Sequence, residues 1–254
     1  MTGLMLTRKN LYKIKGQFSS LLVTVQSALK SHHVSVDEVR SFLVHCSTRD
    51  DWIQNPSNLD ELFTALSVAK LWSYDNYDLL EVITRGLLPN DKNVEKLLFE
   101  YKGRLSGFYT TTKIADFIKL SDFEDSEQDP QQPLPVETYT VKDYRKLKLK
   151  LKIDRKISVL TLSYVDELWR SLAEEFDLPC LTAVIHSIIE GSLVVTWLIL
   201  PHVANKIIDS GSTAKAVKFF RCCNIVSLEI DNDTVFDDQQ MVRDELKLVV
   251  CAYG

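Results

Sequence analysis

The chain lacks a long apolar run. Its longest apolar stretch lies around Leu193–Leu200 and includes Thr196, so it is far shorter than the ~20 residues that span a bilayer. The first ten residues contain no apolar core of signal-peptide length, and Thr2 fails the first requirement for N-myristoylation. We therefore expect a cytoplasmic protein with no membrane partner.

Glycine, proline and cysteine are also scarce. Eight glycines and seven prolines among 254 residues exclude a collagen-like or linker-dominated chain. The five cysteines are odd in number and scattered, with no Cys-x-x-Cys pair, which favours reduced thiols over a disulfide framework or a zinc site. Basic residues number 30 against 35 acidic residues, and the formal charge of -5 disfavours a strongly cationic nucleic-acid binder.

One polar stretch divides the chain. Residues 121–140 contain three prolines and six acidic residues and have little apolar content, as is typical of a linker. We therefore expect a helical bundle over 1–120, a linker over 121–140, an α/β domain over 141–236 and a C-terminal extension over 237–254.

The first half has helical periodicity. Apolar residues recur at spacings of three and four from Leu11 to Leu29, and further stripes follow to Phe108. Ser35 with Glu38 predicts a capping box, and Asn58 with Glu61 predicts another helix start. Gly86 is a candidate C-terminal cap. Because none of these helices could bury its stripe alone, we expect a compact bundle.

The second half has a different period. Lysines alternate with aliphatic residues from Lys146 to Ile153, which predicts a half-buried strand. Helices and strands then follow in the order β-α-β-β-α-β, which is typical of a ferredoxin-like sandwich. In that fold the first strand lies between the third and the fourth, so we expect Lys150 and Lys152 to face Glu229 and Asp231.

The lysine row of this strand is the candidate interaction face. Its members are Lys146, Lys148, Lys150 and Lys152. RNA-recognition domains of this fold stack bases on aromatic residues of the two central strands. Trp197 is expected to pack inward, which leaves no aromatic platform. We therefore favour a protein partner over RNA, and RNA binding by the sheet is the alternative.

No motif for catalysis, a cofactor or a metal stands out. The candidate metal ligands match neither a zinc pattern nor a calcium loop; they are His32, His33, His45 and Cys46, and the aspartates 231, 233, 237 and 238. A pairing of Cys222 or Cys223 with His186 stays open, because such partners meet only in the fold. The turn at 210–213 lacks the glycine spacing of a phosphate loop. We name no catalytic, cofactor-binding or metal-binding residue and expect no cofactor.

Two segments resemble parts of known multidomain proteins. The first runs from Leu62–Ser67 through Trp72–Glu81 to Asp116 and Phe117, and it covers about residues 58–118. It resembles an uncharacterised helical module of sponge and other invertebrate proteins associated with death-fold signalling. Tyr164–Ala173 resembles a segment that follows this module. The resemblance implies a signalling context and no mechanism.

These observations together favour a non-enzymatic protein–protein interaction module of an intracellular signalling or scaffold protein. An RNA-binding protein is the alternative, and an enzyme with a Cys/His site is the weakest hypothesis. The sequence leaves open the identity of the partner, the oligomeric state and whether the chain is a fragment of a longer protein.

Overall fold

A computed structural model describes residues 2–47, 56–68, 72–124, 144–153, 157–178, 183–189 and 193–241. The fold is α+β, as the sequence predicts, because most helices lie in the first half and the second half forms a five-stranded antiparallel sheet. The chain divides into two compact units. The helical unit holds the described residues before Lys113 together with Asp122–Glu124, and the sheet unit holds Lys113–Ser121 and the described residues from Tyr144 onward. The expected linker lies almost entirely outside the described residues.

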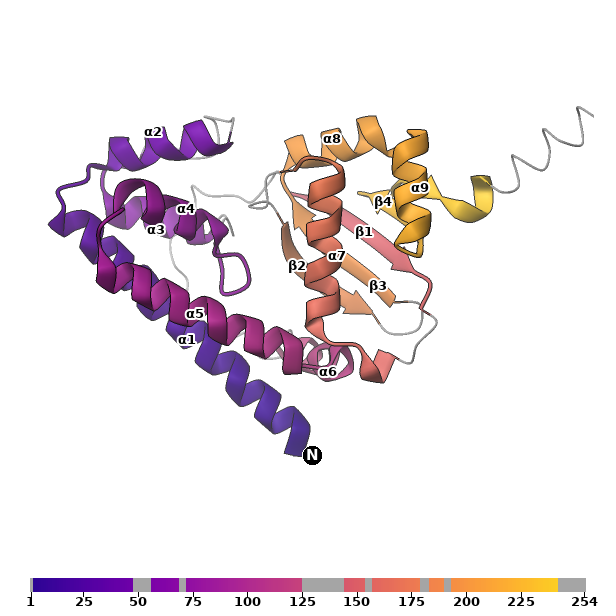
Figure 1. The fold of residues 1–254 in the computed structure, drawn as a ribbon, viewed down its shortest axis with the longest axis horizontal. Coiled ribbons are helices and arrows are strands. Elements are labelled where there is room, and N and C mark those ends of the chain that lie inside the picture. The colour runs from indigo at the N-terminus through magenta and orange to yellow at the C-terminus, as the bar shows by residue number, and fades with distance from the viewer. Residues whose placement is uncertain are drawn as a thin grey trace, which may run out of the picture. The chain divides into compact units, whose positions relative to one another are not determined.

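The helical unit is built around two long helices. In Figure 1, α1 (Thr2–Ser31) runs alongside α5 (Lys92–Thr111), and the rings of Phe18 and Tyr101 lie 5.8 Å apart between them. The apolar stripe of α1 supplies much of this core and consists of Leu11, Ile14, Phe18, Leu21, Val25 and Leu29, all buried. The shorter helices complete the unit; they are α2 (Val36–Ser47), α3 (Leu59–Val68) and α4 (Asp78–Leu87).

Two predicted helix starts are confirmed. The backbone N–H of Glu38 donates to Ser35 Oγ at 3.2 Å, and the N–H of Ser35 donates back to Glu38 Oε2 at 2.7 Å. This reciprocal bonding, first of all the backbone bond from Ser35, lowers the pKa of Glu38. Glu61 likewise donates its N–H to Asn58 Oδ1 at 2.9 Å. Both pairs satisfy N–H groups that the first turn of a helix leaves unpaired.

The prediction that Gly86 caps a helix is wrong. Gly86 lies inside α4, whose last residue is Leu87 and whose C-cap is Leu88. A Cβ atom at this position would lie only 2.1 Å from Phe42 Cζ. The glycine therefore lets the Phe42 ring approach the backbone of α4, and no helix end requires it.

The start of α6 (Ile114–Glu124) belongs to the sheet unit. Lys113 forms an isolated antiparallel bridge with Thr161, and the N–H of Ile114 donates to the carbonyl of Leu160 at 2.9 Å. The Ile114 side chain is fully buried. The division between the two units thus falls at Thr112, earlier than the 120/121 boundary expected from composition.

The sheet has the strand order β2-β3-β1-β4-β5. Its strands are β1 (Arg145–Leu151), β2 (Ala183–Ile189), β3 (Leu193–Ile199), β4 (Ile225–Ile230) and β5 (Asp233–Asp237). The central strand β1 therefore pairs with β3 on one side and with β4 on the other. The edges are β2 and β5.

Three helices cover one face of this sheet: α7 (Leu162–Glu175), α8 (Pro201–Gly211) and α9 (Ala214–Cys222) (Figure 1). A short 3₁₀ helix, η1 (Ile157–Val159), precedes α7. Ring pairs join the two layers: Trp169 of α7 lies 5.9 Å from Trp197 of β3, and Phe220 of α9 lies 4.8 Å from Phe236 of β5. The alternating aliphatic residues of β1, Leu147, Leu149 and Leu151, are also buried, so the opposite face carries the polar residues of the strands.

The strand β5 was not expected from the sequence, because the predicted order β-α-β-β-α-β ends at the strand that corresponds to β4. Asp231 and Asn232 both have positive φ, of 51° and 79°, and they form a two-residue connection, because Ile230 pairs with Asp233. Two successive residues with positive φ are characteristic of a type I′ hairpin turn. Val235 and Phe236 then return to the helix side of the sheet. The expected C-terminal extension beyond residue 241 lies outside the described residues.

Candidate functional site

The lysine row lies on the face of the sheet opposite α7, α8 and α9. Lys146, Lys148 and Lys150 are exposed, whereas the leucines that alternate with them are buried. Lys152 is also exposed, but it lies one residue beyond the end of β1, where its N–H donates to the carbonyl of Asn224. The strand itself therefore presents three of the four lysines of the candidate face.

The predicted pairing of Lys150 and Lys152 with Glu229 and Asp231 is wrong. Lys148 faces Glu229 in the observed register, and Lys150 faces Ser227. Lys148 Nζ lies 3.1 Å from Glu229 Oε2. The register between β1 and β4 also shifts between Lys150 and Leu151, and such an irregularity cannot be derived from an alternating pattern.

Asp231 pairs with the start of β1 instead. Its carboxylate accepts from Arg145 Nε at 2.7 Å and from the backbone N–H of Lys146 at 2.7 Å. Partial burial alone would raise the pKa of Asp231, but these hydrogen bonds and the positive charges of Arg145 and Lys146 outweigh it and hold that pKa below its ordinary value. These bonds hold the β4–β5 hairpin turn against the first two residues of β1.

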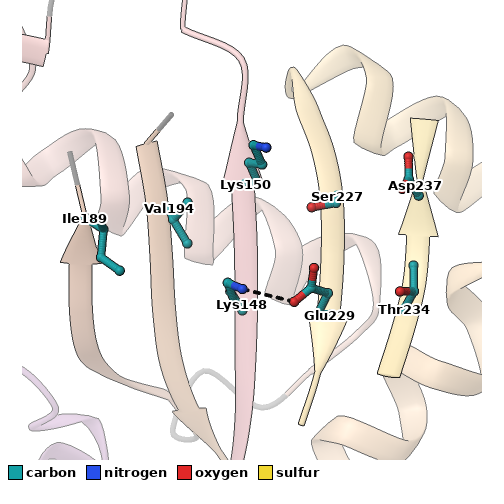
Figure 2. A pocket seen from close by; sticks show the side chains of 8 residues that line it. All are labelled: Lys148, Lys150, Ile189, Val194, Ser227, Glu229, Thr234 and Asp237. Carbon is teal, nitrogen blue, oxygen red and sulfur yellow. Dashed lines mark hydrogen bonds and ion pairs between the residues drawn. The ribbon is translucent and has the colours of Figure 1, made fainter. Parts of the chain in front are cut away.

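An open hollow of about 410 Å³ lies on this face of the sheet. Figure 2 shows its lining as three bands across the strands. We call these the apolar band, the lysine band and the acidic band. They consist, respectively, of Ile189 and Val194, of Lys148 and Lys150, and of Glu229 and Asp237 with the hydroxyls of Ser227 and Thr234.

The charges of the acidic band are largely satisfied within the protein. Glu229 pairs with Lys148, and Asp237 Oδ1 accepts the backbone N–H groups of Gln239 and Gln240 at 2.9 and 3.1 Å. In contrast, Lys150 makes no ion pair with any residue in the described ranges. Its ammonium group is therefore a positive charge in the hollow that no ion pair compensates. The Ile189 side chain, which is 55% exposed, lies two strands away from Lys150, beyond Val194.

The aromatic residues of the sheet lie on its other face. Trp197 is 1% exposed and packs against Trp169, and Phe236 is 3% exposed and packs against Phe220. No aromatic residue is among those that line the hollow. The expected inward packing of Trp197 is therefore confirmed, and the described part of this face offers no platform on which bases could stack.

One of the two candidate catalytic thiols, that of Cys223, is not activated in this fold. Cys222 is exposed and Cys223 is half-buried. Burial raises the pKa of the Cys223 thiol, and the neighbouring Cys222 and Glu175 raise it further, whereas a reactive cysteine needs a lowered pKa. The His186 side chain, the proposed partner, lies outside the described residues.

Three of the remaining candidates make contacts within the described residues. Thr213 Oγ1 caps α9 by accepting from the N–H of Ala216 at 3.2 Å, and Asp238 pairs with Arg221 at 2.8 Å. His32 Nε2 lies 3.7 Å from a carboxylate oxygen of Asp91. Across the described ranges, no cluster of three or more His, Cys, Asp or Glu side chains is placed to hold a metal ion. The side chains of His45 and Cys46 lie outside those ranges.

The aromatic residues of the first resembling segment are part of the helical core. Trp72 is 2% exposed and donates its Nε1–H to Ser67 Oγ at 2.7 Å. The Tyr101 hydroxyl donates to the carbonyl of Tyr74, and the Tyr77 and Tyr101 rings meet edge to face at 5.7 Å. The two tyrosine contacts hold the loop before α4 against α5. Packing of the helical unit is therefore sufficient to explain why this segment contains these aromatic residues.

The residues that the sequence analysis missed lie on β2, β3 and β5. Ile189, Val194 and Thr234 line the hollow but were not singled out as site residues, and Asp237, which also lines it, was considered only as a metal ligand. The dipeptide Asp231-Asn232 followed by a β-branched and aromatic run was a usable hairpin signal. It would have added β5, and with it Thr234 and Asp237, to the predicted face.

Comparison of the chain with protein-family models, with curated proteins and with solved structures found no match. Among the described helices, none combines the length and apolarity that a membrane span requires.

Proposed function

We propose that this protein is a non-enzymatic interaction module of an intracellular signalling or scaffold protein, and that the open sheet face docks a protein partner. The observation that carries this proposal is the position of Lys150, an uncompensated cation on the same face as the exposed apolar band. The partner segment would present a carboxylate to Lys150 and an apolar side chain to Ile189 and Val194. Complementary charge of this kind steers association and fixes register.

The arrangement of the sheet unit supports a ferredoxin-like sandwich extended by β5. The elements follow one another as β1, α7, β2, β3, α8 with α9, and β4, and β1 lies between β3 and β4. Because this fold hosts many unrelated functions, the fold alone does not choose among them. The resemblance of residues 58–118 and 164–173 to invertebrate signalling proteins supports the cytoplasmic, signalling context.

RNA binding by the same face is the alternative, and the exposed lysines are the feature that favours it. The surface offers a poor path for a phosphate backbone, because Lys148 is paired with Glu229 and the acidic band lies beside the lysines. The lining also lacks the aromatic faces that contribute roughly 1–3 kcal/mol per stacked base.

The proposal is tested by selecting peptides from a random display library against the full chain. We expect the enriched peptides to pair an acidic residue with an apolar residue. The Lys150→Glu variant should bind them about tenfold more weakly, which corresponds to ~1.4 kcal/mol. The matched control is Lys218→Glu, which makes the same charge change at an exposed lysine of α9, on the helix side of the sheet.

Two results would contradict the proposal. Selected peptides that bind Lys150→Glu as tightly as the unmodified chain would show that another surface is used. Salt-sensitive binding of a single-stranded RNA oligonucleotide that Lys150→Glu abolishes and Lys218→Glu leaves intact would favour the alternative.

A further inference from the structure

The first 36 residues contain no acidic residue. Asp37 is the first acid in a chain that has 35, whereas Arg8, Lys9, Lys13, Lys15 and Lys30 all precede it. These five basic residues belong to α1. In a protein of net charge -5, this helix is therefore a locally cationic element, and four of its five cations lie within residues 8–15.

The first half of α1 also exposes large apolar side chains. Leu6 is 60% exposed and Tyr12 is 52% exposed, although Leu11 and Ile14 on the other side of the helix are buried. Residues three and four apart share a helix face, so Lys9, Tyr12 and Lys13 lie together. Leu6 flanks this group beside Lys9 and Lys13, and Arg8 flanks it on the other side beside Tyr12, so cations and apolar groups share the exposed arc of the helix. We call this arc the α1 outer face and define it as Leu6, Arg8, Lys9, Tyr12 and Lys13.

The two lysines of this face are open to a partner. Lys9 and Lys13 make no ion pair with the part of the chain that the structure describes. The Arg8 guanidinium lies over the Tyr12 ring, 5.7 Å from its centroid, and donates to the Tyr12 hydroxyl at 3.4 Å. A cation stacked beside an amphipathic tyrosine suits the headgroup region of a bilayer, where such rings sit between water and acyl chains.

We propose that the α1 outer face binds peripherally to bilayers that contain anionic lipids. The lysines contact the negative headgroups, and Leu6 and Tyr12 enter the boundary between headgroups and acyl chains. The helix lies on the membrane, since no described helix is suited to cross it. This attachment departs from the expectation of no membrane partner, and it uses a surface separate from the sheet face.

A bilayer fits this face better than a nucleic acid does. The exposed Leu6 side chain gains nothing from a phosphate backbone, whereas burying it among lipids removes apolar surface from water. The Tyr12 ring already carries Arg8, which leaves less of it for stacking on a base. Acidic protein segments carry the same negative charge as anionic lipids, but they offer no acyl region in which Leu6 and Tyr12 could both be buried.

The test uses the purified full chain in flotation with two kinds of large vesicle, one of phosphatidylcholine alone and one containing phosphatidylserine. We expect binding to the anionic vesicles only. A basic residue near an anionic surface contributes about fivefold in affinity, so Lys9→Ala with Lys13→Ala should weaken binding about 25-fold. The control pair is Lys92→Ala with Lys96→Ala, which removes the same charge from exposed lysines of α5.

Leu6→Gln supplies a second readout, because it should weaken binding to anionic vesicles several-fold without changing the net charge. Circular dichroism verifies that each variant keeps its helical content. Equal binding to neutral and anionic vesicles, equal losses for the two lysine pairs, or no vesicle binding by the unmodified chain would overturn the proposal. An RNA oligonucleotide or a polyglutamate peptide that binds this face more tightly than the anionic vesicles would also overturn it.

Discussion

Lys148 of β1 and Glu229 of β4 lie 3.1 Å apart across the open face of the sheet. Exposed ion pairs of this kind contribute only about 0–1 kcal/mol to stability, so the main effect of the pair is on the distribution of charge. It neutralises the middle lysine of β1 and leaves Lys150, which faces Ser227, as an uncompensated cation on the same face as the apolar band. The face is therefore less basic than its sequence pattern indicates.

The first prediction concerns Asp231, whose pKa is lowered by its bonds to Arg145 and Lys146. A depressed carboxylate pKa contributes stability that is present above its unfolded value of about 3.9 and is lost as the pH falls through the folded value. Asp231→Asn tolerates the positive φ of this position but removes the charge. We expect it to lower the free energy of unfolding by up to about 1 kcal/mol at pH 7 and by less at pH 3.

Urea denaturation at the two pH values measures this difference. Asp177→Asn is the matched control, because Asp177 also has positive φ, of 48°, but its side chain is fully exposed beside Lys206. It should change stability less than Asp231→Asn at pH 7. An effect of Asp231→Asn that is as large at pH 3 as at pH 7 would contradict the assignment.

The sequence predicted the features that depend on local periodicity. The alternation of lysine and leucine located β1 and its two faces, and the Ser35 and Asn58 pairs marked helix starts that the structure confirms. Each of these signals lies within a few residues of chain and depends on the geometry of one helix turn or one strand.

The failures depend on contacts between distant residues. The pairing of Lys148 with Glu229 is set by the β1–β4 register and its irregularity, and neither is encoded in the alternation of either strand. The short β5 was missed because its five residues carry two aspartates, which are unfavourable in strands. The bond from Ile114 to Leu160, 46 positions away, lies within the sheet unit, and composition cannot reveal such a contact.

The second prediction concerns that division. If Lys113–Ser121 belongs to the sheet unit, a fragment of residues 113–254 should melt at a higher temperature than a fragment of residues 141–254. Ile114→Ala in the longer fragment should lower the free energy of unfolding by about 2–4 kcal/mol, because it leaves a cavity at a fully buried site.

Thermal denaturation followed by circular dichroism compares the two fragments. Val159→Ala is the control, since Val159 is an aliphatic residue of the same unit that is 56% exposed, and it should change the melting temperature little. Equal melting temperatures for the two fragments would place the segment outside the sheet unit and would favour the boundary near residue 120.

The last prediction concerns Gly211 at the end of α8. A Cβ atom there would lie 2.4 Å from Val235 Cγ1 of β5, so Gly211→Ala forces α8 and β5 apart. We expect this substitution to lower the free energy of unfolding by about 1–3 kcal/mol, as overpacking of a filled site does. Val235→Ala in the same chain removes the clashing methyl group, and the double variant should recover part of the loss.

Gly107→Ala on α5 is the matched control, because a Cβ atom there meets nothing within 4 Å. It should be neutral or stabilising by up to about 1 kcal/mol, since alanine is the better helix former. Urea denaturation of Gly211→Ala, Val235→Ala, the double variant and Gly107→Ala measures these changes in the free energy of unfolding. If Gly211→Ala proved as benign as Gly107→Ala, or if Val235→Ala added its own loss without any recovery, the close packing of α8 on β5 would be refuted. The placement of β5 as the edge that carries Thr234 and Asp237 into the hollow would then have to be abandoned.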